Sequence, residues 1–317
     1  MTIAFVFPGQ GSQSVGMLAE LAASAPLIRA TFEEASAALG YDLWDLIQRG
    51  PEERLNATEC TQPAMLAAGV ATWRLWQQQD GPAPALVAGH SLGEFTALVC
   101  AGALDLRSAL ELVRFRGQVM QEAAPIGTGA MAAILGLDDA EVEAVCREAA
   151  QGSVVEAVNF NSPGQVVIAG HTEAVQRAMQ VAKARGARRA ALLALSVPSH
   201  SSLMRGAAGR FEERLAGVPI NAPRIGYVSA VDATAHGDPE DIRRLLVRQL
   251  SSPVRWTDTV RALSAAGMSH ILECGPGKVL TGLNRRIEKR IGLDFMAIED
   301  PATLAAALAA AQGAAHA

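Results

Sequence analysis

The sequence has few cysteines, no excess of basic residues and no long apolar run. Its four cysteines form no C-x-x-C pair, which argues against a zinc site or a disulfide framework and suits a reducing compartment. A formal net charge of −5 gives no general attraction to nucleic acid or to an anionic membrane. No apolar run approaches the ~20 residues of a transmembrane helix, and the N-terminus lacks the basic region of a signal peptide. These absences favour a cytoplasmic protein that binds neither nucleic acid nor membrane.

Repeats, low-complexity tracts and nucleotide-binding signatures are also missing. No G-x-G-x-x-G follows an apolar strand, and Gly275-Pro276-Gly277-Lys278 lacks the spacing of a P-loop. The sequence is instead rich in apolar residues, which make up 50% of its 317 residues against 19% charged residues. Such a chain is globular, has a large core and is long enough for roughly two domains.

The strongest chemical signal lies between Ala85 and Leu98, in ALVAGHSLGEFTAL. A short apolar run precedes a G-x-S-x-G pattern centred on Ser91, and a helical run follows it. This is the pattern of a nucleophile elbow, a sharp strand-to-helix turn that presents a serine hydroxyl. Ser91 would then lie at a helix N-terminus, which favours developing negative charge. A plain turn can carry the same five residues, so a base and an oxyanion hole must be found elsewhere in the chain.

Strands and helices alternate through most of the chain. Residues 3–7 form a fully apolar run typical of a buried parallel strand, and they end in the loop Pro8–Gln13. The N–H groups of this loop could face a ligand, or the loop could be a plain turn. The periodicity predicts further strands at 225–228 and 271–274. It also predicts helices at 26–39, 43–48, 62–79, 104–122, 239–250 and 302–317.

The rhythm changes between residues 129 and 197. We expect strands at 131–135, 154–159, 166–169 and 190–197, helices at 138–150 and 172–185, and a turn at 161–164. This β-α-β-β-α-β order is the split ferredoxin-like unit. The sequence therefore predicts an inserted small domain, 129–197, between the two parts of a larger domain, 1–128 and 198–317.

His200 and Arg116 are the candidate partners of Ser91. His200 follows the last small-domain strand, at the domain junction, although a structural role is commoner for any single histidine. His90 is expected to point away from Ser91, since neighbours on a strand face opposite sides. Arg116 falls within the apolar arc of its helix and needs an anionic partner, because an unpaired buried charge is very costly. That partner could be an internal carboxylate or a substrate carboxylate gripped bidentately, and periodicity does not choose between them.

Seven segments in order along nearly the whole chain resemble the malonyl-CoA:acyl carrier protein transacylase family. They are PGQGSQ (8–13), GHSLGE (89–94), RGQVMQEA (116–123), NFNSPGQ (159–165), VPSH (197–200), RQLSSPV (248–254) and ECGPGKVLTGL (273–283). The resemblance implies an α/β fold in which an α/β-hydrolase-like large domain with a mostly parallel sheet is interrupted by a small ferredoxin-like domain that closes the cleft.

The resemblance also implies residue roles. Ser91 would be the nucleophile, His200 its base, and Gln249 the residue that orients the histidine in place of a carboxylate. The backbone N–H groups of Gln10 and Leu92 would form the oxyanion hole. The substrate-binding residues would be Arg116, which pairs with the malonyl carboxylate, and Asn159 and Asn161, which line the cleft.

The implied activity is that of an [acyl-carrier-protein] S-malonyltransferase, which forms a malonyl-serine intermediate and supplies fatty-acid biosynthesis. Its substrates would be malonyl-CoA and the phosphopantetheine thiol of an acidic acyl carrier protein, with no bound cofactor and no metal, and we expect a monomer. Alternatives are a malonyl transferase of polyketide synthesis or malonate decarboxylation, a serine hydrolase or thioesterase, and a non-enzymatic carrier-binding module. The sequence departs from the family at Val228–Val231, where small residues replace a frequent asparagine, and we expect an effect on packing near the cleft.

Two basic clusters are candidate docking surfaces for the carrier protein. The first comprises Lys183, Arg185, Arg188 and Arg189, and the second Arg285, Arg286, Lys289 and Arg290. Either could equally be a solvated basic face.

Overall fold

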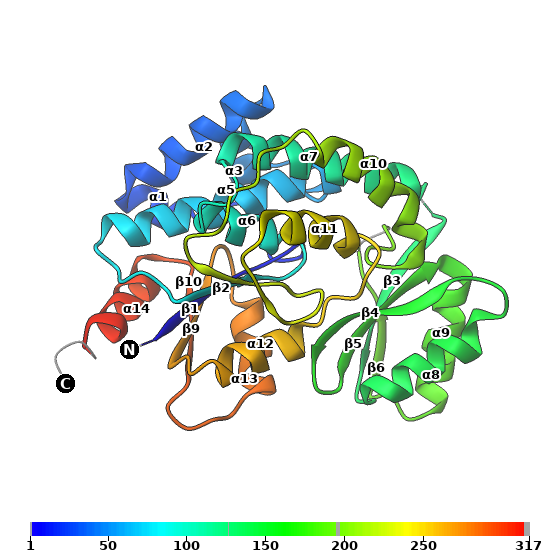
Figure 1. Ribbon diagram of the computed structural model, residues 1–317. Coiled ribbons are helices and arrows are strands. Elements are labelled where there is room, and N and C mark those ends of the chain that lie inside the picture. The colour runs from blue at the N-terminus through cyan, green and yellow to red at the C-terminus, as the bar shows by residue number, and fades with distance from the viewer. Residues whose placement is uncertain (1, 126, 195–196, 314–317) are drawn as a thin grey trace.

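The computed structural model, which describes residues 2–125, 127–194 and 197–313, contains two separate sheets (Figure 1). The larger has the strand order β10-β9-β1-β2-β7-β8, and its strands are parallel except for β8, which runs antiparallel to β7. These strands are β1 (Ile3–Phe7), β2 (Leu86–Gly89), β7 (Gly226–Val228), β8 (Ala235–His236), β9 (His270–Cys274) and β10 (Asp294–Ile298). All five residues of β1 are buried, as expected for a central parallel strand.

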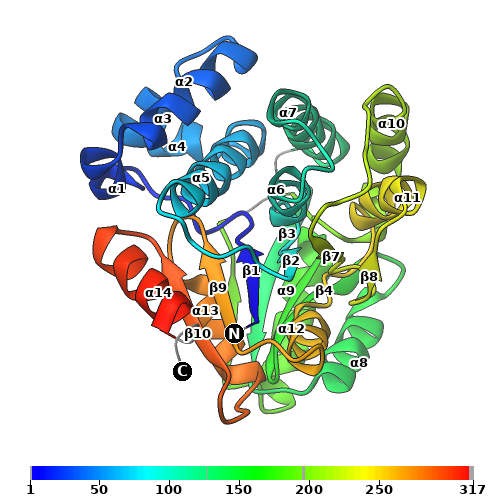
Figure 2. The ribbon, with the colours of Figure 1, turned by 60° about the vertical axis from the view of Figure 1, so that its left-hand side comes forward.

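Helices cover both faces of this sheet, and β1 shows why. Phe5 and Phe7 point into the larger core cluster on one face, whereas Ala4 and Val6 point into a second cluster on the other. The first face carries, among others, α5, α6 and α7, and the second carries α12 and α13 (Figure 2). The helices of the large domain are α1 (Ala19–Ser24), α2 (Pro26–Leu39), α3 (Leu43–Arg49), α4 (Glu52–Leu55), α5 (Thr58–Gln78), α6 (Gly93–Cys100), α7 (Leu106–Ala123), α10 (Arg205–Leu215), α11 (Pro239–Gln249), α12 (Trp256–Ala265), α13 (Val279–Ile287) and α14 (Pro301–Gly313).

The smaller sheet is antiparallel, with the order β4-β5-β3-β6. Its strands are β3 (Gly129–Leu135), β4 (Val155–Ser162), β5 (Gln165–His171) and β6 (Arg189–Leu192). Helices α8 (Asp139–Ala150) and α9 (Thr172–Ala184) pack on it, and a capping box at Asp138 starts α8. This is the β-α-β-β-α-β unit, and with the largely parallel first sheet it confirms the predicted fold class. The unit lies inside 129–197, the range that we propose for the inserted domain.

Several predicted boundaries were wrong. Helix α5 begins at Thr58 rather than at 62, and β6 ends at Leu192 rather than at 197. Strand β4 continues to Ser162, which pairs with Gln165 across a two-residue turn, so Asn161 lies in a strand and not in a turn. The C-terminal helix α14 begins at Pro301 and is described to Gly313, and residues 314–317 of its predicted range lie outside the described residues, as do 195–196.

Strand β4, at one edge of the small sheet, is joined to the large domain. The N–H of Phe160 donates to the Val254 carbonyl (3.0 Å), and the N–H of Val254 donates to the Val158 carbonyl (2.9 Å). The segment that follows α11 therefore pairs with the edge of β4 in a parallel bridge. This pairing fixes the small domain next to the C-terminal end of α11. Of the described helices, none has the length and apolar character needed to cross a membrane.

Candidate active site

Ser91 lies on the sharp turn between β2 and α6, with a left-handed backbone (φ 52°). Both flanking glycines are required by contact. A Cβ at Gly89 would lie 1.9 Å from the Gly93 carbonyl carbon, and a Cβ at Gly93 would lie 2.0 Å from the carbonyl oxygen of Phe7. The turn is the nucleophile elbow that the sequence pattern predicts, and it presents the Ser91 hydroxyl above the carboxyl ends of β1 and β2.

His200 lies within hydrogen-bond distance of that hydroxyl. Its Nε2 is 2.7 Å from Ser91 Oγ, and its Nδ1 is 2.8 Å from the backbone carbonyl oxygen of Gln249. Since a carbonyl can only accept, Nδ1 carries the proton and Nε2 is free to accept the serine proton. Burial, with the positive charge of Arg116, lowers the pKa of His200 to about 3, so the imidazole is neutral near pH 7. The orienting group is thus a main-chain carbonyl rather than a carboxylate.

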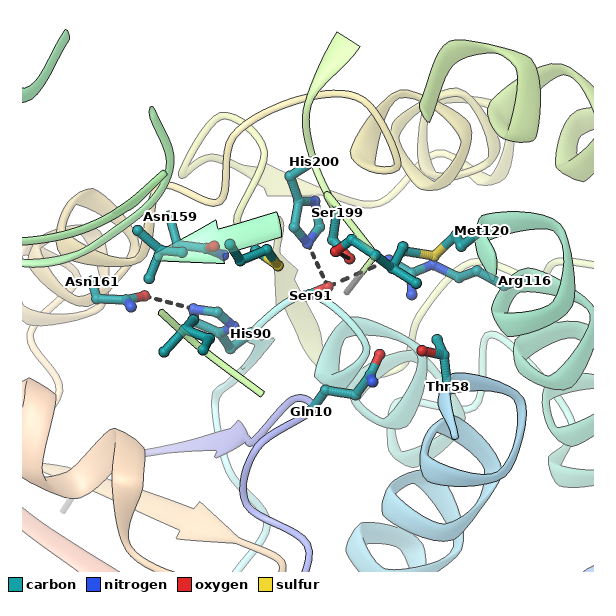
Figure 3. A pocket seen from close by; sticks show the side chains of 14 residues that line it. Gln10, Thr58, His90, Ser91, Arg116, Met120, Asn159, Asn161, Ser199 and His200 are labelled. Atoms are coloured by element: carbon teal, nitrogen blue, oxygen red, sulfur yellow. Dashed lines mark hydrogen bonds between the residues drawn. The ribbon is translucent and has the colours of Figure 1, made fainter. Parts of the chain in front are cut away.

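Arg116 is 1% exposed and points to the same hydroxyl (Figure 3). Its two terminal nitrogens donate to the side-chain oxygens of Gln62 and Gln249, both at 2.9 Å, and one of them lies 3.3 Å from Ser91 Oγ. Within the described residues no carboxylate lies close enough to form an ion pair with it. Burial lowers the pKa of Arg116 to about 10, which leaves it charged near pH 7. An internal salt bridge is therefore not its partner in this structure.

Glu94 is a residue that sequence reasoning missed. It is fully buried on α6, and its carboxylate accepts hydrogen bonds from the Gln249 side chain, the Ala230 N–H and, at 3.0 Å, the Ser229 hydroxyl. Burial raises its pKa to about 7. The available signal was an acidic residue in the otherwise apolar helix GEFTALVC. Ser229 and Ala230, which belong to the Val228–Val231 segment, both donate to this carboxylate, so the segment packs directly behind the cleft.

The N–H groups of Gln10 and Leu92 flank Ser91 on the large-domain side. Gln10 lines the same pocket, and Leu92 directly follows the serine as the N-cap of α6. Across the part of the chain that the structure describes, neither N–H donates to an acceptor in the protein. Two such donors beside a nucleophile can bind an oxyanion.

The opposite wall of the pocket comes from the small domain. Asn159 and Asn161 of β4 both line it, together with the apolar side chains of Met131, Val167 and Leu193. The side-chain oxygen of Asn161 lies 2.8 Å from Nε2 of His90, which also lines the pocket. The His90 ring lines the same pocket but is directed to Asn161 and the Trp256 ring rather than to the Ser91 hydroxyl (Figure 3).

The structure thus brings most of the predicted site residues to one pocket of about 140 Å³. It is lined by Gln10, Ser91, Arg116, Asn159, Asn161 and His200, with Gln249 and Leu92 directly behind. Thr58 and Met120 line it as well, and sequence reasoning did not identify them or Gln62. No group of His, Cys, Asp and Glu in the described ranges is arranged to hold a metal ion. The arrangement can form an acyl-serine and bind an anionic group beside it.

Comparison with known proteins gives full-length matches. The family described as acyl transferase domain matches residues 4–290. The malonyl CoA-acyl carrier protein transacylase of Escherichia coli (strain K12) is 58% identical over 305 residues, which cover 96% of this chain and 98% of the relative. The transacylase of the same name from Bacillus subtilis (strain 168) is 42% identical, over 96% of each chain.

Solved structures give the same result. A malonyl-CoA:acyl carrier protein transacylase from Xanthomonas oryzae pv. oryzae matches with a TM-score of 0.95 and 58% identity, over 98% of this chain and 99% of that chain. A malonyl-transacylase in complex with its acyl carrier protein from a type II polyketide synthase matches with a TM-score of 0.95 and 55% identity, over 97% of this chain and 99% of that chain.

Proposed function

This chain belongs to the acyl transferase family of malonyl-CoA:acyl carrier protein transacylases, and we propose that Ser91, His200 and Arg116 carry out its reaction. The protein is an acyl-carrier-protein S-malonyltransferase. It moves a malonyl group from malonyl-CoA to the phosphopantetheine thiol of an acyl carrier protein and supplies fatty-acid biosynthesis.

In the first half-reaction, Ser91 attacks the thioester carbonyl of malonyl-CoA. Nε2 of His200 takes the serine proton as the Oγ–C bond forms, and the N–H groups of Gln10 and Leu92 hold the resulting oxyanion. The C–S bond then breaks, and His200 returns the proton to the leaving CoA thiolate. The 2.7 Å contact between Ser91 and His200 and the acceptor state of Nε2 support these roles.

In the second half-reaction, the carrier's thiol replaces CoA. It loses its proton to Nε2 of His200 and attacks the malonyl-serine ester, and Ser91 leaves with the same proton. Between the two steps the ester must survive water, and the small pocket, with apolar side chains on its small-domain wall, favours that survival.

Arg116 selects the malonyl group. A guanidinium that is already buried and already held by two amide oxygens can take a carboxylate bidentately without further ordering. An acetyl group would leave this buried charge unmatched, which disfavours it. We assign Asn159 and Asn161 to the wall that faces the acyl chain.

The observation that carries the proposal is that one hydroxyl, Ser91 Oγ, lies within reach of both a neutral imidazole (2.7 Å) and a buried guanidinium (3.3 Å). A fixed cation at that place suits an acyl group that carries a free carboxylate.

The partner is an acyl carrier protein, and we infer that it docks on a basic surface of a monomeric, cytoplasmic enzyme. In the second basic cluster Arg285 and Arg290 donate to the Phe295 and Ser264 carbonyls, whereas Arg286 donates to the Gly282 carbonyl of its own helix and to the Gln165 side chain. Arg286 and Lys289 are therefore the residues to reverse in charge. In the first cluster the matched pair is Lys183 and Arg188. A reversal that weakens transfer and its salt dependence identifies the docking surface, and an unchanged rate clears that cluster.

Intact-mass analysis after mixing with malonyl-CoA tests the function. We expect a malonyl adduct on the wild type, none on Ser91→Ala, and discharge of the adduct when a phosphopantetheinylated carrier protein is added. Because one similar structure is the malonyl-transacylase of a type II polyketide synthase, carriers of both the fatty-acid and the polyketide type should be compared. Discharge to free malonate without any carrier would instead indicate a hydrolase.

A further inference from the structure

Glu94, a buried carboxylate that the mechanism above does not use, lies behind the anion-binding side of the site. It is 0% exposed, and its contacts come from α11 and from the segment after β7. A buried carboxylate with three donors and no directly paired cation is uncommon, because its desolvation is costly.

The hydrogen bonds of Gln249 allow only one orientation of its side-chain amide. Its side-chain nitrogen donates to Glu94 and to the carbonyl oxygen of Ser91 (3.0 Å), which uses both amide protons. Its side-chain oxygen consequently faces Arg116, from which it accepts at 2.9 Å. The ionised carboxylate and the Ser91 carbonyl can only accept, so together they determine which end of the amide is turned to the guanidinium.

The guanidinium is set by this amide and by Gln62. Each terminal nitrogen of Arg116 gives one N–H to an amide oxygen, Gln62 on one side and Gln249 on the other. The terminal nitrogen bound to Gln249 gives its second N–H to Ser91 Oγ at 3.3 Å, and the second N–H of the other terminal nitrogen, which has no acceptor among the described residues, remains for a ligand. The two amide oxygens thus fix the orientation of the planar Arg116 guanidinium. That orientation decides whether the guanidinium can bind a carboxylate by two hydrogen bonds.

We propose that Glu94 is a positioning residue that orients the Gln249 amide and, through it, the Arg116 guanidinium for an acyl group with a free carboxylate. The inference rests on the proposed function and extends it to the source of acyl specificity. Glu94 acts mainly as a hydrogen-bond acceptor and less through its charge, because Gln249 lies between Glu94 and Arg116. If the Gln249 amide were reversed, its N–H₂ group would face the guanidinium directly.

The test is Glu94→Gln, which keeps the size of the side chain and makes one of its two ends a donor. The end that faces Ala230 and Ser229 must remain an oxygen, so the new amide nitrogen faces Gln249. Gln249 then either keeps its nitrogen toward the Ser91 carbonyl and meets the new donor of residue 94, or reverses and turns its nitrogen to Arg116. In both cases two donors meet, and the contact that orients the guanidinium is disturbed. We expect the rate of malonyl loading of Ser91 to fall by about tenfold or more, the effect of a misplaced charged hydrogen bond, while acetyl loading changes little.

The matched control is Ser229→Ala, which removes one donor to Glu94 and leaves the Gln249 contact in place. We expect it to keep the wild-type ratio of malonyl to acetyl loading. If malonyl and acetyl loading fall equally in Glu94→Gln, Glu94 is a purely structural residue. If the ratio of malonyl to acetyl loading rises, Glu94 acts only through its negative charge, which opposes the malonyl carboxylate. Either result overturns the proposal. Absence of any malonyl adduct on the wild type would instead refute the proposed function.

The wild type supplies a second measurement if Glu94→Gln does not fold. Protonation gives the carboxyl a donor, and the pKa of Glu94 is raised to about 7 by burial. The groups that face it are Gln249 of α11, the Ser229 hydroxyl, the Ala230 N–H and the buried Tyr227 phenol of β7, and the charge of Arg116 of α7 interacts with it. The malonyl-to-acetyl loading ratio should therefore fall as pH decreases from about 8 to about 6, a range in which an ordinary substrate carboxylate stays ionised. A flat ratio overturns the proposal.

Discussion

The two walls of the pocket are built differently. On the large-domain wall, Arg116, Gln249 and Glu94 are at most 1% exposed and are bound to one another. The small-domain wall presents two asparagines among apolar side chains, and the side-chain oxygen of one of them, Asn161, accepts a hydrogen bond from Nε2 of His90. Fixed charge recognition and proton transfer thus belong to the large domain, whereas the small domain shapes the cavity. Variants on the two walls should differ accordingly.

Ser91→Ala should have the largest effect, because it removes the atom on which both walls converge. Loss of a catalytic serine typically costs about 10⁴-fold or more in rate, and we expect no malonyl adduct by intact mass. The melting temperature should stay near that of the wild type. An adduct of the same mass on the variant would place the acyl group elsewhere.

Arg116→Ala should have the second largest effect, and the effect should differ between malonyl-CoA and acetyl-CoA. Removing one partner of a buried charge interaction costs about 2–5 kcal/mol, so kcat/KM for malonyl-CoA should fall by about 30-fold to several thousand-fold. The value for acetyl-CoA should fall less. Arg116→Lys should not restore malonyl transfer, since lysine lacks the planar fork. Equal losses for both thioesters would mean that Arg116 only supports the fold.

The burial of His200 predicts an unusual pH profile. An ordinary histidine, with a pKa near 6.5, would be about 97% protonated at pH 5 and would lose about 30-fold in rate. Because the pKa of His200 is lowered to about 3, the base stays unprotonated, and serine acylation by acetyl-CoA should be nearly constant between about pH 5 and pH 8. Acetyl-CoA is the right probe, since it has no carboxylate and avoids the effect expected from Glu94. A fall with a midpoint near 6.5 would contradict the structure.

Glu156→Gln should test whether the small domain also holds the base. The Glu156 carboxylate of β4 accepts from the N–H and the hydroxyl of Ser202, both at 2.7 Å, two residues after His200. His200 has a left-handed backbone (φ 67°), which costs free energy unless neighbouring contacts hold it. We expect malonyl and acetyl transfer to fall together by about three- to tenfold. The equal loss would distinguish Glu156 from Glu94, and Ser202→Ala should reproduce part of it.

Asn161→Ala should have the smallest effect. It removes the partner of His90 but no group of the anion-binding side, so we expect a loss of about two- to fivefold in kcat/KM for both thioesters, the size of one neutral hydrogen bond. Steady-state kinetics with the two thioesters measures it. A selective loss of malonyl transfer would move part of the carboxylate recognition to the small-domain wall.

The sequence predicted what depends on local pattern. The alternation of strands and helices, the elbow at Ser91 and the inward position of Arg116 all follow from short-range periodicity, and the motif resemblance pointed to His200 and Gln249. Contacts between distant segments were not predictable. Glu94 sits in an apolar helix, and its three partners come from residues more than 130 positions away. Asn161 precedes Ser-Pro-Gly, which is typical of a turn, yet pairing with β5 keeps it in β4.

The most direct measurement is a crystal structure of the malonyl-serine form, obtained by flash-cooling crystals of the wild type soaked in malonyl-CoA without a carrier protein. We predict that the free carboxylate lies about 2.7–2.9 Å from both terminal nitrogens of Arg116, with the ester oxygen toward the N–H groups of Gln10 and Leu92. A carboxylate turned to the small-domain wall or to solvent, with Arg116 unmoved, would contradict the account.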